Sequence, residues 1–570
     1  MVIKDSLKEW LLILREDAYV KMLLLLIIIA FIIRIWGIWN IEQTDEFNEV
    51  FEALKVDSGR LNLERWNKKV LIYILALEYG IYFFAGWVAG IFSSISDFAS
   101  KIVINMSPLF IIGRATSASF GTLIVLFTYL IGSKLFNKQT GLIAALFLSF
   151  NYVHVEHSHL VLVDITMNLM VMCCFYFTTL LMYRGEKTAY FFSGLFAGLA
   201  IVAKTPSVFI LISIGVAHLL YSRERSASFK NILISKHILF MLFGFSLGTI
   251  LGSPGILVGL PKFLKWLTSL FGAYIGTHDQ IDYWAPINGY KFYIVSICKN
   301  MGLPLFIITM SGVLYFLIKP RKEFVLLISF ALPFYLFMAH SKWVLTDRYM
   351  IPIYPFLSII AGYFFFEITK LLRINKKLIA TIALLILLAI PIKNVVLFEM
   401  TLLQRNTRYW SKDWIEGNIP QGSKILIDSG RTINTYSPPL FNSKENIISM
   451  ITTIESLEAG ETFDDSRIVD SKSSIYFKYL LNNPPEITYN LTSTELGRKA
   501  KSIEYYRNND FDYIITSTHI TAKAYNKKWA GKYPIAAKFY RSLDKEFTIV
   551  KEFTPGLTRS GPTITIYKVK

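Results

Sequence analysis

Repeated apolar runs, each about the length of a bilayer crossing, constrain the fold of this chain more than any other feature. The first run is LLLLIIIAFIIRIWGI at 23–38, and further runs follow as far as residue 398. A helix needs about 20 apolar residues to cross roughly 30 Å of hydrocarbon, and it satisfies its backbone hydrogen bonds internally. Of the 570 residues, 53% are hydrophobic and 18% are charged. The sequence therefore predicts a multi-pass α-helical membrane protein.

The apolar runs predict about eleven transmembrane helices. Their spans are 22–39, 111–133, 140–154, 160–182, 189–203, 207–221, 237–257, 292–318, 323–340, 348–372 and 378–398. One more run, at 70–92, contains Glu78 and several glycines, so it also fits an interfacial or re-entrant helix. Whether this run crosses the membrane decides on which side of the membrane all the following loops lie.

The charges of the short loops decide whether the run at 70–92 spans. With a cytoplasmic N-terminus and no span there, the cytoplasmic loops hold 15 basic residues and only three acidic ones. This distribution follows the positive-inside rule, and counting 70–92 as a span would reverse it. We therefore predict that 70–92 does not span. The loops and residues 401–570 together account for the net charge of +18, so nucleic acid is not an expected partner.

The composition changes to that of a soluble domain after residue 400. Strand-like segments are SKILIDS (423–429), FDYIITST (511–518), EFTIVKEF (546–553) and TITIYKVK (563–570), with helical stretches between them. We predict a transmembrane domain over 1–400 with an exoplasmic loop at 40–108, and an exoplasmic α/β domain over 401–570. The plasma (inner) membrane is the expected location. The three cysteines lie in apolar runs and suggest neither a disulfide framework nor a metal site.

Polar residues next to the hydrocarbon gather on one predicted side of the membrane. They are Asp45, Glu46, Arg114, His154, Glu156, His157, His159, Asp164, Lys204, His278, Asp279, Asp282, Lys342, Asp347 and Arg348. Charge within a helical turn of the hydrocarbon is costly unless it is paired or functional. This one-sided set predicts a polar cavity at the exoplasmic interface.

Cations at the membrane boundary and carboxylates above it suit transfer from a polyprenyl-phosphate sugar. The lipid tail would lie in the bilayer, and arginine or lysine would offset the charge that grows on the leaving phosphate. A carboxylate on the opposite side would deprotonate an acceptor hydroxyl. One base suffices, because the phosphate leaves as an anion, and the anomeric carbon would be inverted.

The order of several segments resembles the protein O-mannosyltransferase superfamily. These segments are TDEFNEVFEALKVDSG, IIGRATSASFGTLIVLFTYLIGSKLF, HSHLVLVDITMNL, GLFAGLAIVAKTPS and DRYMIPIYPFL. The superfamily is a GT-C type group that also contains the lipid A aminoarabinose transferases. The resemblance covers about residues 20–370, and DWIEGNIPQGSKILIDSG and FDYIITSTHI resemble the soluble domain of many members. It implies a mannosyltransferase-like membrane enzyme of the cell envelope.

The resemblance also implies roles for individual residues. Asp45 matches the catalytic base, and Glu46 would orient it or bind the acceptor. Arg114, Lys204 and Arg348 match the cations near the donor phosphate.

The remaining site residues are implied to bind substrate. Asp164 matches the acidic residue of the fourth helix, and His157, His159 and His278 join it. Some relatives bind a metal at the position of His278, but the accompanying glutamate-lysine-proline stretch is replaced here by LERWNKK at 63–69. We therefore assign no metal ligands and no cofactor from the sequence, and a divalent metal is left as an open alternative.

Each of these assignments has a simpler structural interpretation. Asp45 and Glu46 could be helix-start carboxylates favoured by the helix dipole. The three cations could extend toward lipid headgroups, as helix-end cations usually do. The histidines could belong to a short hydrated loop, and Asp164 could form a structural salt bridge.

Two functions from other classes compete with sugar transfer. A transporter or flippase for a lipid-linked glycan would also need an interfacial cationic cavity, but it should show polar residues on both sides of the membrane. A non-catalytic partner that keeps the transferase fold is the third hypothesis. The sugar and the acceptor, whether protein, lipid or envelope glycan, are not evident from the sequence.

Overall fold

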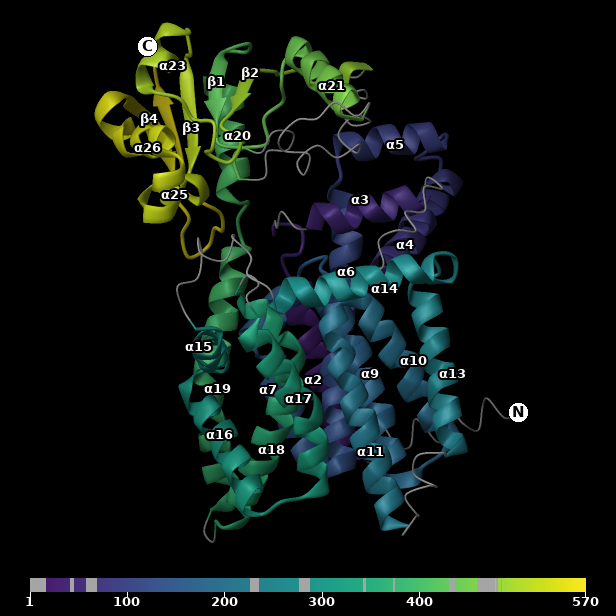
Figure 1. Ribbon diagram of the computed structural model, residues 1–570. Coiled ribbons are helices and arrows are strands. Elements are labelled where there is room, and N and C mark those ends of the chain that lie inside the picture. The colour runs from purple at the N-terminus through teal and green to yellow at the C-terminus, as the bar shows by residue number, and fades with distance from the viewer. Residues whose placement is uncertain are drawn as a thin grey trace. The chain divides into compact units, whose positions relative to one another are not determined.

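The computed structural model describes most of the chain, in two compact units (Figure 1). The described residues are 17–41, 46–57, 69–225, 235–275, 288–341, 345–372, 375–429, 436–458, 477, 480–482 and 484–569. The first unit comprises Met1–Ile38, Asn48–Tyr82 and Leu109–Phe398, and the second comprises Trp39–Phe47, Phe83–Pro108 and Glu399–Lys570.

The first unit is a helical membrane bundle. Eight described helices are long and apolar enough to cross a membrane: Ala18–Ile35 (α2), Lys69–Val88 (α4), Ser107–Leu135 (α6), Val163–Arg184 (α9), Thr205–Glu224 (η1 with α11), Lys322–His340 (α17), Asp347–Lys370 (η3 with α18) and Lys376–Thr401 (α19). Shorter helices lie between them: Lys138–Ser149 (α7), Tyr152–Ser158 (α8), Lys187–Ala203 (α10) and Lys236–Gly252 (α13). The chain is an integral multi-pass membrane protein, as predicted.

The described spans differ in detail from the eleven predicted ones. The run at 292–318 is two helices, Gly289–Met301 (α15) and Leu303–Ile318 (α16), which meet at 117°. Gly302, with φ +76°, separates them, and Pro304 lacks the N–H that a continuous helix would need. This segment is thus a broken helix rather than one straight span. Counting the bent pair as one crossing gives up to nine spans among the described residues.

Two further segments depart from the predicted pattern. The run at 70–92 forms α4, which length and composition place among the eight candidate spans, so its exclusion remains a prediction from loop charge. Residues Ile256–Ile275 form α14, which the sequence analysis did not predict. A non-helical Gly259 and a proline at 261 interrupt α14, which runs across the direction of α9, α11 and α13 (Figure 1).

The centre of the bundle is formed by α9 and by η3 with α18. The apolar window of α9 is 83% buried and that of η3 with α18 is 78% buried, whereas those of α2 and α19 are only 22% buried. Lipid must therefore cover most of α2 and α19. The first turn of α9 and the η3 segment place Asp164 and Arg348 at the end of the buried core.

Helices α10 and α13 approach through matched glycines. Gly194 and Gly198 of α10 face α13, and Gly244 and Gly248 of α13 face α10. A Cβ atom at any of these four positions would overlap a backbone carbonyl oxygen of the other helix. Two small-xxx-small sequences thus bring the helix backbones into direct contact.

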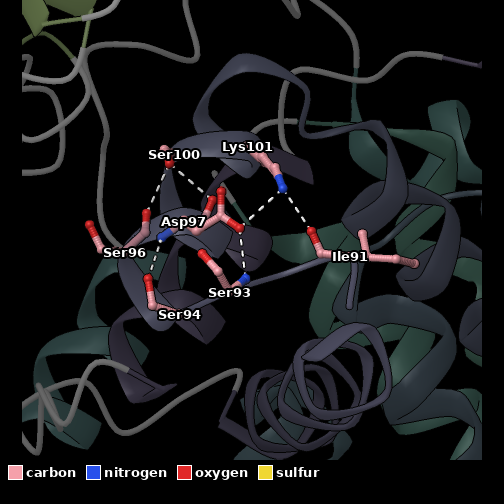
Figure 2. Close-up of polar contacts among 7 residues, drawn as sticks. All are labelled: Ile91, Ser93, Ser94, Ser96, Asp97, Ser100 and Lys101. Carbon is pink, nitrogen blue, oxygen red and sulfur yellow. Dashed lines mark hydrogen bonds and ion pairs between the residues drawn. The ribbon is translucent and has the colours of Figure 1, made fainter. Parts of the chain in front are cut away.

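A short helix of the second unit, Ile95–Ile104 (α5), begins with a tightly bonded N-terminus. The Ser94 Oγ accepts from the Asp97 N–H at 3.1 Å, and the Asp97 carboxylate accepts from the Ser93 N–H at 2.8 Å. Figure 2 shows that Lys101 Nζ closes this group by donating to Asp97 and to the carbonyl oxygen of Ile91. These reciprocal contacts satisfy N–H groups at the helix start.

The C-terminal part of the second unit is built on a five-stranded mixed sheet. The strands are Lys424–Ile427 (β1), Asn490–Ser493 (β2), Tyr513–Ser517 (β3), Thr548–Phe553 (β4) and Ile564–Lys568 (β5), in the order β2-β1-β3-β5-β4. Strands β2, β1 and β3 are parallel, whereas β5 runs antiparallel to β3 and β4. The predicted α/β domain is confirmed, and β2 is the strand that the sequence analysis missed.

Helices flank this sheet. They are Thr407–Asn418 (α20), Lys444–Glu458 (α21), Ile503–Asn508 (α23), Thr518–Thr521 (α24), Lys527–Lys532 (α25) and Pro534–Glu546 (α26), with the 3-10 turn Ala522–Tyr525 (η4). Ile415 of α20 packs with Ile425, Ile427 and Ile515, so alternate residues of β1 form one face of the core.

A buried carboxylate joins the ends of the parallel strands. Asp428 directly follows β1, and its carboxylate accepts from the Ser517 N–H at 3.1 Å, the Thr494 hydroxyl at 2.9 Å and the Tyr540 hydroxyl at 2.5 Å. Burial raises the pKa of Asp428 from its ordinary 3.8 to about 6, although these hydrogen bonds act in the opposite direction.

Asp428→Asn is expected to remove a pH dependence of stability. Because the native state of the wild type binds the extra proton, its free energy of unfolding falls between about pH 4 and pH 6 and then levels off. The fall is about 3 kcal/mol, from about 1.4 kcal/mol per pH unit. Thermal unfolding across this range should show a weaker decline for Asp428→Asn, whereas the exposed Asp413→Asn should follow the wild type. Equal declines in wild type and Asp428→Asn would contradict the assignment.

Candidate active site

A buried ion pair joins the fourth and fifth predicted spans. Asp164 lies in the first turn of α9, where the helix dipole favours a carboxylate. Lys204 directly follows α10, and Pro206 prevents the helix from continuing. The Lys204 Nζ donates to the Asp164 carboxylate at 2.5 Å, and the Asp164 side chain is only 4% exposed. The structure therefore brings together two residues that lie 40 positions apart.

Arg348 lies in the electrostatic field of the same pair. The aromatic ring of Tyr349 lies 4.5 Å from the Lys204 Nζ and 5.8 Å from the Arg348 Cζ. Arg348 and His157 also act electrostatically on Asp164. Four predicted site residues thus form one cluster, which we call the α9 cluster: His157, Asp164, Lys204 and Arg348. Tyr349, which the sequence analysis did not single out, supports both cations, and its place after Arg348 was the available signal.

Arg114 and His159 lie in a second group, around the turn that follows α2. The Arg114 guanidinium donates to the Ile38 carbonyl oxygen at 2.8 Å and stacks over Phe110. The His159 Nε2 lies 3.0 Å from the carbonyl oxygen of Trp36. The His159 Nδ1 lies 2.9 Å from the carbonyl oxygen of Val155, so both ring nitrogens face carbonyl oxygens. These two residues hold the turn that follows α2.

A third polar group, around Arg34, escaped the sequence analysis. Arg34 of α2 is fully buried, and its guanidinium donates to the carbonyl oxygens of Ala30, Leu148 and Ser149 and contacts the His154 Nδ1 at 3.1 Å. It therefore fixes the end of α7 and the start of α8, which carries His157. A lone arginine inside an apolar run is the sequence signal that could have identified it.

Several predicted site residues cannot be placed in these clusters. Asp45 and His278 lie outside the described residues. Glu46 begins Glu46–Asp57 (α3) and is fully buried, within the second unit. Within the described part of the chain, no group of three or more His, Cys, Asp or Glu side chains could hold a metal ion.

Comparison with protein families gives one match. Residues 83–248 match the family described as dolichyl-phosphate-mannose-protein mannosyltransferase. The matched segment includes Arg114, Asp164 and Lys204. No curated protein matches the chain.

Comparison with solved structures gives relatives in fold. The apo oligosaccharyltransferase of Archaeoglobus fulgidus aligns with a TM-score of 0.51 and 12% identity, over 94% of this chain and 73% of that one. ArnT from Cupriavidus metallidurans bound to undecaprenyl phosphate aligns with a TM-score of 0.47 and 11% identity, over 99% of this chain and 98% of that one. At such identities, the oligosaccharyltransferase match shows a shared fold.

The membrane bundle and the mixed-sheet domain thus have the fold of this oligosaccharyltransferase. The resemblance predicted from the sequence is confirmed over residues 83–248, which match the family model described as dolichyl-phosphate-mannose-protein mannosyltransferase.

Proposed function

We propose that this protein transfers a sugar, with inversion, from a polyprenyl-phosphate donor to a hydroxyl acceptor on the exoplasmic face. The observation that carries the proposal is the convergence of Lys204 and Arg348 on Asp164 at one end of the bundle core. The ammonium of Lys204 and the guanidinium of Arg348 are two cations that can offset the negative charge of a phosphodiester. The family match supports a lipid-phosphate mannose donor.

The proposed chemistry assigns a separate task to each group. Lys204 and Arg348 stabilise the negative charge that develops on the leaving polyprenyl phosphate. Asp164 holds the Lys204 ammonium in place and is a positioning residue. Asp45 accepts the proton of the acceptor hydroxyl as its oxygen attacks the anomeric carbon. The C–O bond to phosphate breaks as the new glycosidic bond forms, so the configuration is inverted.

Lys204→Gln is expected to lower kcat/KM for the donor by about 100-fold or more, because a cation that stabilises the leaving phosphate is lost. Purified variants can be compared by release of polyprenyl phosphate. Lys138→Gln is the matched control, since Lys138 forms an exposed ion pair with Asp17 at the start of α7.

A double variant separates donor binding from a structural salt bridge. Lys204→Gln alone leaves Asp164 buried without its ammonium partner, which destabilises the fold. Lys204→Gln with Asp164→Asn removes both charges and should restore stability without restoring transfer. Recovery of transfer in the double variant would show that the pair is only structural.

The proposed activity is tested with a panel of radiolabelled polyprenyl-phosphate sugars. Wild-type protein should release polyprenyl phosphate from one donor and transfer its label to a membrane or envelope acceptor. Translocation of an intact donor across proteoliposomes, with no release, would instead support a transporter or flippase. Binding without turnover or translocation across the whole panel would support a non-catalytic partner.

A further inference from the structure

The C-terminal sheet has a topological switch point next to Asp428. Strand β1 lies between β2 and β3 in the parallel part of the sheet, so the chain leaves β1 in one direction and later returns on its other side. In parallel sheets with this 2-1-3 order, ligands bind outside the carboxyl ends of the strands at the junction of strands one and three. The hydrogen bond from the Ser517 N–H to Asp428 crosses this junction.

Positive side chains surround this carboxyl edge. Lys523, in η4, is half-buried. Among the described residues, the charges of Arg498 and Asp428 interact with its ammonium group. Burial and the charge of Arg498 lower the pKa of Lys523. His519 lies in the field of Arg408 and Lys523. Like charges are thus held together around one buried carboxylate, an arrangement that a bound anion would stabilise.

An unsatisfied hydroxyl group lies at the same junction. Ser517 ends β3 and is fully buried, and its Oγ has no hydrogen-bond partner among the described residues. A buried hydroxyl without a partner costs free energy and calls for a specific explanation. The Asp428 carboxylate attracts Lys523 and accepts three hydrogen bonds, but it does not give the Ser517 hydroxyl a partner.

We propose that the carboxyl edge of the C-terminal sheet, at the junction of β1 and β3, binds a phosphate group. Lys523 is the counter-ion, and the Ser517 hydroxyl donates a hydrogen bond to a phosphate oxygen. A phosphorylated glycan and a phospholipid headgroup both carry this chemistry. A phosphorylated glycan would be an acceptor for the transferase, and that last step alone rests on the proposed function.

Calorimetric titration of the full-length protein with mannose 6-phosphate tests the site, with mannose as the uncharged control ligand. The wild type should bind the phosphate and not mannose. Lys523→Gln and Ser517→Ala should each weaken binding, by about 10- to 100-fold for the lysine and about threefold to tenfold for the serine. Lys545→Gln, an exposed lysine of α26, should bind as the wild type does.

These variants keep the test decisive even if one of them folds poorly. Ser517→Ala removes a hydroxyl that has no described partner, so it should fold normally. No binding of mannose 6-phosphate by the wild type, or unchanged binding in both Lys523→Gln and Ser517→Ala, would overturn the proposal.

The source of the phosphate is identified in nanodiscs. If phosphatidylglycerol competes with mannose 6-phosphate and phosphatidylcholine does not, the site binds a lipid headgroup. If neither lipid competes, the site binds a phosphorylated glycan. The titration needs no donor, so an Asp45→Asn protein that has lost transfer should still bind, which separates this proposal from the proposed function.

Discussion

Replacing Asp45 with asparagine should lower the rate of sugar transfer by about 10²- to 10⁴-fold, the usual contribution of a general base. Asparagine keeps the size of the side chain but cannot accept the acceptor's proton. Donor binding should be unchanged, because in the proposed mechanism the donor phosphate is bound by the cations of the α9 cluster and not by Asp45. The loss should therefore appear in kcat rather than in the donor KM. Single-turnover transfer from a saturating donor measures this step directly.

Two matched variants show whether the loss is specific to Asp45. Glu46→Gln should reduce transfer less, because an orienting residue acts through the base rather than on the proton. Asp413→Asn, an exposed residue of α20, should have no effect. Full activity in a stably folded Asp45→Asn protein would refute the mechanism, whatever the behaviour of the other two.

Arg34→Met should produce the largest loss of stability among the substitutions considered for the bundle. The fully buried guanidinium bonds three backbone carbonyl oxygens and His154. Methionine has a similar length but no hydrogen-bond donor. Each buried carbonyl oxygen that loses its hydrogen bond to Arg34 lowers the free energy of unfolding by about 1–3 kcal/mol. A total of about 3 kcal/mol is expected, with lower transfer, because α8 carries His157. Heating in detergent, followed by size-exclusion chromatography, measures the fraction that remains folded.

The control and the conservative variant define what Arg34 does. Arg184→Met removes an arginine that is 55% exposed at the end of α9, and it should change stability by less than about 0.5 kcal/mol. Arg34→Lys keeps the charge but loses the planar fork that bonds several carbonyl groups, so it should be intermediate. Wild-type stability in Arg34→Met would contradict the structural role.

The sequence predicted those features that depend on local composition. Hydrophobic length located the helices of the bundle, because the bilayer fixes that length. Short segments rich in β-branched and aromatic residues located β1, β3, β4 and β5. Strand β2 was missed because NLTS is short and polar at the edge of the sheet. The break at Gly302 was missed because apolar length does not report a change of direction.

The sequence predicted which residues belong to the candidate site, but it did not predict which of them contact one another. Asp164 and Lys204 form an ion pair because helices α9 and α10 pack against each other. The spacing of the two residues in the sequence does not specify this packing. The structure joins them, while the salt-bridge and substrate interpretations of Asp164 predict different behaviour of the double variant. Arg34 could have been noticed as a lone arginine in an apolar run. Its contacts could not have been predicted, because the carbonyl groups of Leu148 and Ser149 lie more than 100 residues away in the sequence.

The glycine contacts between α10 and α13 limit how these two helices can move relative to each other. Backbones that touch through four glycines cannot slide or rock past one another without losing those contacts. Lys204 ends α10, so its height in the membrane is set by a rigid pair of helices. A carrier that exposes its cargo alternately to two sides needs helices that shift, whereas a catalyst gains from a stationary charge. The lysine that we propose binds the donor phosphate therefore follows a helix whose backbone packs directly against its neighbour.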